Sequence, residues 1–431
     1  MDMPVVAIVG RPNVGKSTLF NRIIRRPAAI THERPGVTRD RNAVEFEWNG
    51  RAFLLVDTGG YVVSSRDVLE RAVSEQSLIA VEEADVVLLL VDVKSGITDQ
   101  DEAIRDALVK QGKPVVLGVN KVDRNRDEAD MYGFYNLGLG EPYPVSGYTG
   151  RGTGDLLDAV VNLLPPEKQG VTGDEDAVRI AVIGRPNVGK SSLVNALAGK
   201  QAVLVSDIPG TTRDSTDTRL TWNGRRVILV DTAGLKRVTK LKESLEYYSS
   251  LRALRSLARC DVAVVMVDIS EGLTAYDKSI IDDVECAGKG LIIAANKWDL
   301  VKKDTMTMKR IEREVRAAIP DKEDYPVVFI SAKTGQRVQN VLEIADRIHQ
   351  ARKFRIPTAE FNRFAETLPI PPGAGDLTIR YGTQTGAEPP SFVLFVSDPP
   401  KVKDNFIRYV ERAIRKTFGF EGAPIRLSFR K

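Results

Sequence analysis

The sequence Gly-Arg-Pro-Asn-Val-Gly-Lys-Ser occupies residues 10–17, and the same eight residues recur at 184–191. Each copy matches G-x-x-x-x-G-K-[ST], a loop between a strand and a helix whose backbone N–H groups surround nucleotide phosphates. One match is weak evidence on its own, but two matches in one chain are not accidental. The sequence therefore predicts two phosphate-binding loops of the same kind.

The two halves of the chain remain alike beyond these loops. At one constant offset, Thr38 aligns with Thr212, Trp48-Asn49-Gly50 with Trp222-Asn223-Gly224, and Asp57-Thr58-Gly59-Gly60 with Asp231-Thr232-Ala233-Gly234. A register that persists over this length indicates a duplicated domain rather than a duplicated motif.

Apolar, strand-sized runs alternate with helical patterns in both halves. We expect strands over 5–9, 43–48, 52–56, 86–91 and 115–119, and again over 179–183, 227–230, 262–267 and 291–295. Continuous apolar runs are typical of strands buried on both faces of a parallel sheet. Asn49-Gly50 and Asn223-Gly224 each predict one antiparallel hairpin. The predicted fold class is α/β, with two doubly wound and mostly parallel sheets.

The chain divides into three predicted domains. We expect a first nucleotide-binding domain over 1–165, a linker over 166–177, a second nucleotide-binding domain over 178–350 and an α+β domain over 351–431. The linker is rich in proline, glycine and charge and has no apolar periodicity. The last domain is expected to contain a helix over 358–368, strands over 377–381 and 391–396, a helix over 403–418 and a strand over 424–429.

Composition excludes several classes of protein. Hydrophobic residues make up 42% of the 431 residues and charged residues 28%, as in ordinary globular proteins. The longest apolar runs, 86–91 and 262–267, are far shorter than the ~20 residues that span a bilayer. No signal peptide precedes the first strand and no coiled-coil heptads are present, so we expect a cytoplasmic monomer. Cys260 and Cys286 are expected to be buried thiols, and two histidines are too few for a zinc site or a serine triad.

Positive charge is concentrated at the C-terminal end. From Arg352 onward there are fourteen Lys and Arg against eight Asp and Glu, whereas the net charge of the whole chain is +4. On the expected helix over 403–418, Phe406, Val410 and Ile414 form an apolar stripe, and Arg408, Arg412 and Arg415 lie on the opposite side. This arginine side is either a solvated face or a contact for a phosphate backbone.

The loops carry the residues that phosphoryl transfer requires. Lys16 and Lys190 are expected to reach the β- and γ-phosphates, and Ser17 and Ser191 to place a hydroxyl on Mg²⁺. Thr38 and Thr212 are the candidates for a second hydroxyl on the metal, and Asp57 and Asp231 for its carboxylate. Gly60 and Gly234 are expected to bond the γ-phosphate through their backbone N–H only while that phosphate is present, so its loss would release both switch segments.

Base choice is predicted from Asn120-Lys121-Val122-Asp123 and Asn296-Lys297-Trp298-Asp299, each of which follows an apolar strand. A carboxylate there can accept from N1–H and the exocyclic amino group of guanine, an arrangement that adenine does not offer. The predicted nucleotide is therefore GTP. The segments Ser146-Gly147 and Ser331-Ala332-Lys333 are similar to the loop whose backbone meets guanine O6.

The full set of predicted nucleotide contacts repeats in the two halves. It comprises Gly10, Arg11, Pro12, Asn13, Val14, Gly15, Lys16, Ser17, Asp57, Thr58, Gly59, Gly60, Tyr61, Asn120, Lys121, Val122, Asp123 and Ser146, and Gly184, Arg185, Pro186, Asn187, Val188, Gly189, Lys190, Ser191, Asp231, Thr232, Ala233, Gly234, Leu235, Asn296, Lys297, Trp298, Asp299, Ser331 and Ala332.

A glutamine that orients the attacking water in Ras-like switches is absent, because its place holds Tyr61 in one half and Leu235 in the other. Hydrolysis then needs another source of positive charge. Asn13 and Asn187 put a carbonyl oxygen near the place of an arginine finger, so a bound monovalent cation is one hypothesis. Arg11, Arg39, Arg185 and Arg213 are alternative arginines in cis, although a solvated or structural role is the simpler interpretation of each.

With these residues assembled, the chain resembles the EngA/Der family of bacterial tandem GTPases, over nearly its whole length. The resemblance implies two P-loop GTPase domains followed by a KH-like domain. It further implies GTP hydrolysis stimulated by K⁺ held at Asn13 and Asn187. The implied partner is the large ribosomal subunit with its rRNA, bound according to which domain holds GTP.

The sequence departs from the usual KH pattern. KH modules that clamp single-stranded RNA carry a G-x-x-G loop, whereas this chain has only Gly373-Ala374-Gly375 in a proline-rich turn. Contact with rRNA through charge, binding of protein, or docking between the nucleotide domains all remain open for this module. The basic segment 236–259 is likewise either a solvated helix or a nucleotide-gated RNA or interdomain contact. Alternatives for the whole chain are a signalling switch that binds a protein partner, and an idle sensor role for one nucleotide domain.

Overall fold

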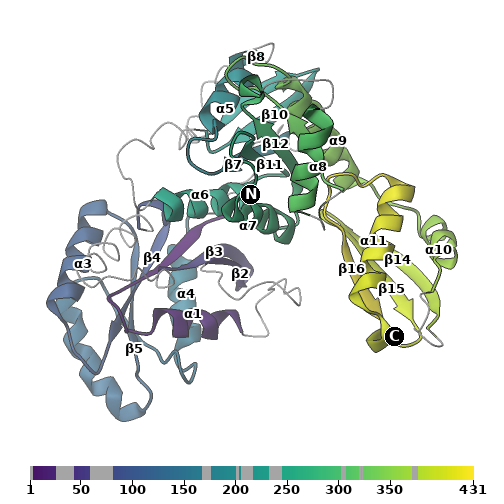
Figure 1. Ribbon diagram of the computed structural model, residues 1–431. Coiled ribbons are helices and arrows are strands. Elements are labelled where there is room, and N and C mark those ends of the chain that lie inside the picture. Colours follow the sequence, from purple (N-terminus) through teal and green to yellow (C-terminus); the bar gives the residue numbers. More distant parts are fainter. Residues whose placement is uncertain are drawn as a thin grey trace. The chain divides into compact units, whose positions relative to one another are not determined.

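The computed structural model of the protein describes residues 3–25, 43–58, 81–166, 176–199, 203–204, 217–232, 245–301, 307–319, 322, 324–370 and 377–431 (Figure 1). The chain forms two compact units: Met1–Gly170 together with Leu241–Ala258, and Val171–Lys240 together with Arg259–Lys431. No helix among the described residues combines the length and the apolar character needed to cross a membrane.

The first unit contains an α/β domain built on a six-stranded sheet within the described ranges. Its strand order is β2 (Ala43–Trp48), β3 (Arg51–Asp57), β1 (Val5–Val9), β4 (Val86–Asp92), β5 (Val115–Asn120) and β6 (Pro142–Pro144). Only the β2–β3 pair is antiparallel, across the Asn49-Gly50 turn. We call this the first α/β domain.

Helices cover both faces of this sheet because side chains alternate along each strand. Val6 and Ile8 of β1 join the core formed with α1 (Lys16–Ile24) and α4 (Thr153–Leu163). Val5, Ala7 and Val9 join the opposite core, formed with α3 (Asp99–Gln111) and the 3₁₀ helix η1 (Asn125–Leu137). The sheet is therefore doubly wound, as predicted.

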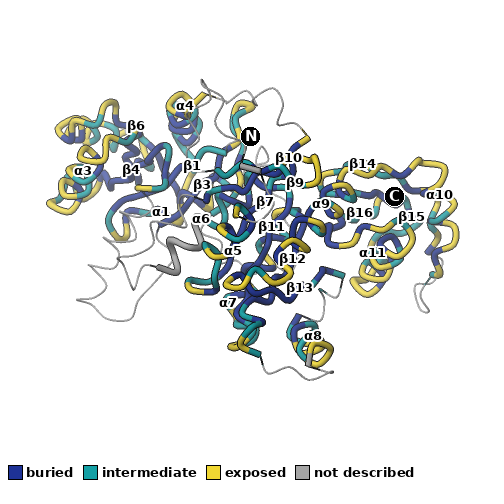
Figure 2. The backbone as a smooth tube through the Cα atoms, turned by 90° about the horizontal axis from the view of Figure 1, so that it is seen from above, coloured by how far each residue is buried: buried dark blue, intermediate teal, exposed yellow. Residues whose placement is uncertain are grey.

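The second unit repeats this architecture in a second α/β domain. The described part of its sheet has the order β13 (Val327–Phe329), β12 (Gly290–Asn296), β11 (Val262–Asp268), β7 (Val178–Gly184), β10 (Arg225–Val230), β9 (Thr218–Trp222) and β8 (Val203–Leu204). Its helices are α5 (Lys190–Gly199), α7 (Ala275–Cys286), η3 (Trp298–Leu300), α8 (Thr307–Ala318) and α9 (Gln339–Lys353), whereas α6 (Leu245–Arg259) belongs to the first unit up to Ala258. Figure 2 shows the central strands as buried and the outer sides of the helices as exposed.

The C-terminal module follows in the predicted α-β-β-α-β order. It consists of α10 (Thr358–Glu366), β14 (Ile379–Ala387), β15 (Pro390–Val396), the 3₁₀ turn η5 (Pro399–Lys401), α11 (Asp404–Phe418) and β16 (Arg426–Arg430). Phe406, Val410 and Ile414 are buried, so the predicted apolar stripe of α11 is confirmed. β14 runs six residues past the predicted end, from Tyr381 to Ala387, because it pairs with β15 along its length.

Two interpretations made from the sequence are wrong, one in the C-terminal module and one in the second α/β domain. Arg415 does not belong to an exposed arginine face: it is buried, and its Nη1 donates to the carbonyl oxygens of Phe420 at 2.7 Å and Ala423 at 2.5 Å. Its Nε also lies 3.3 Å from Asp324 of the second α/β domain. Cys260 is buried as expected, but Cys286 is only half-buried.

Candidate functional site

In both α/β domains the loop at 10–17 or 184–191 has a backbone shape that only its glycines allow. A Cβ on Gly10 (φ +156°) would lie 2.3 Å from the Leu90 carbonyl oxygen, and one on Gly15 (φ +95°) would lie 2.5 Å from Asn120 Nδ2. Gly184 and Gly189 meet the same obstacles, at 2.5 Å from Met266 O and 2.4 Å from Asn296 Nδ2. The loop therefore turns sharply out of the sheet before its helix begins, which opens the backbone to a ligand.

The loop lysines bond to their own loops. Lys16 Nζ donates to Gly10 O at 2.8 Å and to Arg11 O at 3.0 Å, and Lys190 Nζ donates to Gly184 O at 2.8 Å and to Arg185 O at 2.6 Å. Burial lowers the pKa of Lys16, although the charge of Asp57 opposes this shift. Burial lowers the pKa of Lys190 to about 8. Both amines are thus desolvated and preorganised for an anion.

The residues present fit a magnesium ion in the first α/β domain. Asp57 ends β3 as a buried carboxylate, and Ser17 is exposed in the first turn of α1. Hydroxyl and carboxylate oxygens are the ligands that Mg²⁺ prefers. Thr58 Oγ1 donates to Ile8 O at 2.9 Å and so fixes the chain just after the carboxylate.

The second α/β domain differs at this place. Its strand β10 ends one residue before Asp231, which has a positive φ of 55° and whose backbone N–H donates to Asp217 Oδ1 at 2.9 Å. Asp217 is in turn held by Arg259 at 2.6 Å. The two predicted carboxylates therefore stand in different local conformations.

The asparagines that begin the predicted base motifs connect three segments. Asn120 Nδ2 donates to Val14 O at 2.7 Å, and its Oδ1 accepts from the Gly147 N–H at 2.9 Å. Asn296 makes the same pair of bonds, to Val188 O at 2.7 Å and from the Ala332 N–H at 2.9 Å. Each buried amide thus joins the phosphate loop to the loop predicted to meet guanine O6.

The rest of the base motif is also held in position. Lys121 has a positive φ of 68°, and its Nζ lies 2.6 Å from Asp92. Asp123 accepts from Ser146 Oγ at 2.7 Å, and this bond lowers the pKa of the Asp123 carboxyl. Lys297 pairs with Asp268, and Trp298 is buried against Phe329 with ring centroids 4.8 Å apart. In the first α/β domain the result is a charged, oriented carboxylate at the position predicted to accept from guanine.

The sequence analysis did not predict the carboxylates that pair with the two loop arginines. Arg11 lies 3.4 Å from the fully buried carboxylate of Asp101, and Arg185 lies 3.0 Å from that of Asp277. Arg185 also pairs with Glu271 at 2.9 Å. These contacts support the structural interpretation of both arginines. The sequence signal was present, because Thr98–Asp101 and Thr274–Asp277 are capping boxes that place a carboxylate at the start of α3 and α7.

The structure brings together the phosphate loop, the end of β3 or β10, and the base motif in each α/β domain. The predicted contacts Thr38, Gly59, Gly60 and Tyr61, and their counterparts Thr212, Ala233, Gly234 and Leu235, lie outside the described residues, as do Arg39 and Arg213. Of the basic segment 236–259, Arg252 pairs with Glu83 at 2.8 Å and Arg255 with Asp85 at 3.6 Å, all within the first unit. These two arginines are therefore committed to protein carboxylates.

Comparison with known proteins identifies similar sequences along the whole chain. Residues 5–121 and 179–297 match the family described as 50S ribosome-binding GTPase, and residues 355–430 match that described as KH-domain-like of EngA bacterial GTPase enzymes, C-terminal. The chain is 46% identical over 435 residues to GTPase Der of Chloroherpeton thalassium, with 99% of each chain covered. It is 48% identical over 436 residues to GTPase Der of Moorella thermoacetica, with 100% of this chain and 99% of the relative covered. A structure of Era in complex with MgGDPNP and nucleotides 1506–1542 of 16S ribosomal RNA matches 59% of this chain and 92% of that chain, with 21% identity and a TM-score of 0.31.

Nucleotide binding in the second α/β domain should depend on pH through Lys190. Bound phosphates raise the pKa of this amine above its value of about 8 in the empty site, so GDP binding is strongest well below pH 8, where the amine is protonated, and weakens as the pH rises through that value. We expect the GDP affinity of this domain to fall about tenfold between about pH 7 and about pH 9, because the free amine loses roughly nine-tenths of its protons over that interval.

Calorimetry can measure the two domains separately. Asp123→Asn replaces one of the two carboxylate acceptors of the first α/β domain with an amide donor, which opposes the guanine N–H groups, so GDP then reports on the second domain. Asp299→Asn is the matched control for the reverse case. Loss of the guanine N1 proton at high pH weakens GDP binding in both domains equally, so only the difference between the domains reports on Lys190. A decline in the second α/β domain no steeper than that in the first would contradict the role given to Lys190.

Proposed function

We propose that this chain, which belongs to the EngA/Der family of bacterial tandem GTPases, uses two GTP-binding domains to control its association with the large ribosomal subunit and its RNA during ribosome assembly. The chain is a GTPase, as its two matched GTPase domains and its full-length Der relatives establish. The description of the matched family as 50S ribosome-binding supports the choice of the large subunit. We place this activity in the cytoplasm.

The observation that carries the proposal is that both domains repeat the same phosphate-loop and base-motif contacts within the described residues. In both domains a desolvated lysine, a loop shaped by glycine and a buried asparagine amide occur in the same geometry. Because the same contacts occur in both domains, we infer that each domain binds nucleotide. The repeated contacts give no support to an idle sensor role for either domain.

The proposed mechanism assigns phosphate binding to the loop and sensing to the segments that flank it. Lys16 and Lys190 exchange their loop carbonyls for the β- and γ-phosphates, while the backbone N–H groups of the loop hold the other phosphate oxygens. Bound Mg²⁺, held by Ser17, Thr38 and Asp57 and by Ser191, Thr212 and Asp231, would neutralise charge on the phosphates. Gly60 and Gly234 report the γ-phosphate through their backbone N–H.

Asn13 and Asn187 are the proposed ligands of a potassium ion in this family of sites. Both residues are exposed, and both have a positive φ, 66° and 65°. Arg11 and Arg185 are tied to Asp101 and Asp277, so neither is available as an arginine finger in this arrangement. A cation beside the loop would supply the missing positive charge.

The C-terminal module offers a surface suited to RNA. The exposed ring of Tyr381 stacks on Phe395 with centroids 4.2 Å apart, and exposed Arg430 pairs in register with Phe395 on the next strand. Aromatic rings beside arginine can stack on unpaired bases without a G-x-x-G loop. Exposed Lys403, which precedes α11, and exposed Arg408, Arg412 and Lys416 of α11 add positive charge to the same module.

Sedimentation of cell extract tests the proposed partner. The chain should travel with ribosomal particles to different extents in GDP and in a non-hydrolysable GTP analogue, and the association should fall steeply with salt because phosphate contacts release counterions. Lys16→Ala and Lys190→Ala made separately should each abolish part of this nucleotide dependence. Failure to sediment with ribosomal particles in either nucleotide, together with salt-insensitive binding to a protein, would favour a signalling switch instead.

The proposed potassium site has its own test. GTP turnover in KCl should exceed turnover in NaCl at matched ionic strength, since K⁺ and Na⁺ differ in size while screening is equal. Asn13→Ala should remove the potassium-dependent part of the rate in the first GTPase domain and leave that of the second. Equal rates in the two salts would eliminate the potassium site without affecting the assignment of GTPase activity.

A further inference from the structure

The loops predicted to meet guanine O6 are built alike in the two α/β domains. Gly150 N–H donates to Ser146 O at 2.7 Å, and Gly335 N–H donates to Ser331 O at 2.8 Å. Ser146 N–H donates to Arg151 O at 3.0 Å, and Ser331 N–H donates to Gln336 O at 3.1 Å. The two loops therefore share the same backbone hydrogen bonds, so residues at equivalent positions can be compared directly.

In the first α/β domain a side chain from helix α1 braces this loop. Arg22 Nε donates to Gly147 O at 3.2 Å, and its Nη2 donates to Tyr148 O. The methylene groups of Arg22 run across Gly150, where a Cβ would lie 3.4 Å from Arg22 Cδ. The guanidinium thus joins α1, which begins at the phosphate-binding lysine, to the loop that meets the base.

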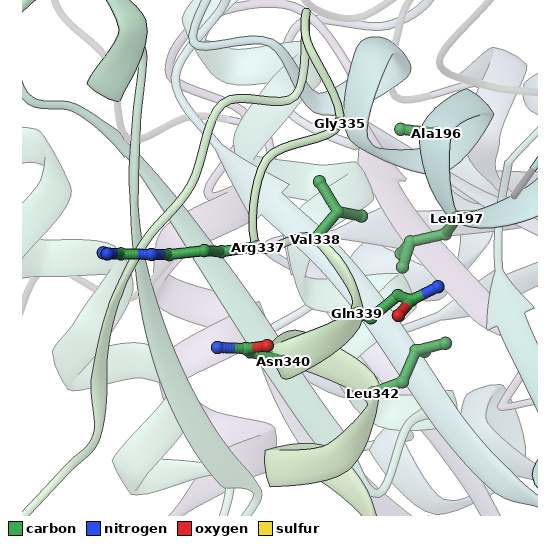
Figure 3. A pocket seen from close by; sticks show the side chains of 8 residues that line it. All are labelled: Ala196, Leu197, Gly335, Arg337, Val338, Gln339, Asn340 and Leu342. Carbon is green, nitrogen blue, oxygen red and sulfur yellow. The ribbon is translucent and has the colours of Figure 1, made fainter.

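The second α/β domain lacks this brace. At the constant offset of the duplication, the place of Arg22 in α1 is taken by Ala196 in α5. Beside Ala196 lies a surface pocket of about 110 Å³, whose lining includes Leu197, Gly335, Val338 and Leu342 (Figure 3). Gly335 corresponds to Gly150, over which the stem of Arg22 runs. The pocket therefore occupies the space that the arginine stem fills in the first α/β domain.

The chain's own Arg337 does not fill the pocket. Although Arg337 lines it, its side chain points away from Leu197 and Leu342 (Figure 3), and its Nη1 lies 3.6 Å from Met308 Sδ. The methylene groups of a long side chain from elsewhere could pack on Leu197, Val338 and Leu342, beside the amide of Gln339, which also lines the pocket (Figure 3). In the order of the loop, Ala332 and Lys333 are the counterparts of Gly147 and Tyr148, whose carbonyl oxygens accept from Arg22 in the first α/β domain.

We propose that this pocket of the second GTPase domain binds an arginine side chain presented by a protein partner. The inference rests on the proposed function, because it assumes that the adjoining loop holds guanine nucleotide. Arginine is favoured over lysine because the Nε and Nη2 of one rigid guanidinium reach two successive carbonyl oxygens in the first domain, a pair of donors that the single Nζ of lysine does not reproduce. The partner's guanidinium would brace the loop and so slow release of GDP from the second domain.

The charges around the pocket set its affinity. Asp155 in the first turn of α4 is replaced by Asn340 in the first turn of α9, so the pocket lacks a carboxylate at that place. The N-terminus of α9 and Arg337 both disfavour a cation. The free guanidinium therefore binds weakly, and firm occupancy needs a partner that holds the arginine at high effective concentration. The first domain is braced permanently, whereas bracing of the second depends on the partner.

Release of fluorescent GDP tests this proposal in the full-length chain. Asp123→Asn confines GDP to the second domain, and Asp299→Asn confines it to the first. In the Asp123→Asn background, Ala196→Arg should slow release about five- to tenfold, the value of one or two hydrogen bonds. Asn195→Arg, which adds the same charge at the neighbouring exposed position, should leave release unchanged. In the Asp299→Asn background, Arg22→Ala should accelerate release by a similar factor.

N-acetyl-arginine methylamide at tens of millimolar is the probe for the occupant. It should slow release from the second domain of the Asp123→Asn chain, lose that effect with Ala196→Arg, and slow the accelerated release of Arg22→Ala in the first domain. The lysine analogue should have little effect at either place. Asn340→Asp should strengthen the response of the second domain, because it restores the carboxylate present in the first.

Three results would overturn the proposal. The first is an arginine amide that rescues Arg22→Ala but leaves release from the second domain unchanged. The second is release from the first domain that Arg22→Ala does not alter, since Arg22 would then be no model for the pocket. The third is a short oligouridylate that slows release in place of the arginine amide, which would identify RNA as the occupant. Failure of the proposed function would be seen differently, as the absence of GDP binding before any release is measured.

Discussion

A buried asparagine amide in each GTPase domain is the interaction on which the nucleotide site depends. Asn120 and Asn296 each hold the carbonyl of the loop valine and the N–H of the base loop at 2.7 and 2.9 Å. The three segments come from distant parts of the chain and make no regular secondary structure with one another at this point. An amide is suited to the task because it donates and accepts through one rigid group. Leaving either backbone partner unsatisfied in a buried site would cost about 1–3 kcal/mol.

Ion pairs and desolvation complete the preparation of the site. The buried carboxylates of Asp101 and Asp277 anchor Arg11 and Arg185 at the start of the phosphate loop, and the capping boxes that contain them hold those carboxylates in place. Within the anchored loop, burial weakens the hydration of Lys16 and Lys190, so phosphate replaces carbonyl partners rather than bulk water. The site is thus preorganised, so little free energy is lost in ordering it when nucleotide binds.

The elements predicted best from the sequence were those with a local signal. Continuous apolar runs located β1, β4 and β11 because such strands are buried on both faces, and the two Asn-Gly turns located the hairpins. The strands β6 and β13 were not predicted, because three-residue strands at the end of a sheet have no periodicity to detect. Arg415 was misassigned for a different reason. Helical spacing predicts on which side of a helix a residue lies, but it does not predict that the carbonyl oxygens of Phe420 and Ala423 are placed to accept from a buried guanidinium. The contrast between Arg22 and Ala196 cannot be interpreted from the sequence alone, because the pocket beside Ala196 is a feature of the folded chain (Figure 3).

The most direct test of the central claim is a calorimetric titration of GDP into the full-length chain and its asparagine variants. The account predicts two equivalents of GDP for the unmodified chain, and one tight equivalent for either Asn120→Ala or Asn296→Ala, with the affinity of the altered domain reduced about a hundredfold because two buried bonds are lost. ATP should not compete. Retention of two equivalents at unchanged affinity in both variants, or uptake of ATP as tight as that of GDP, would contradict it.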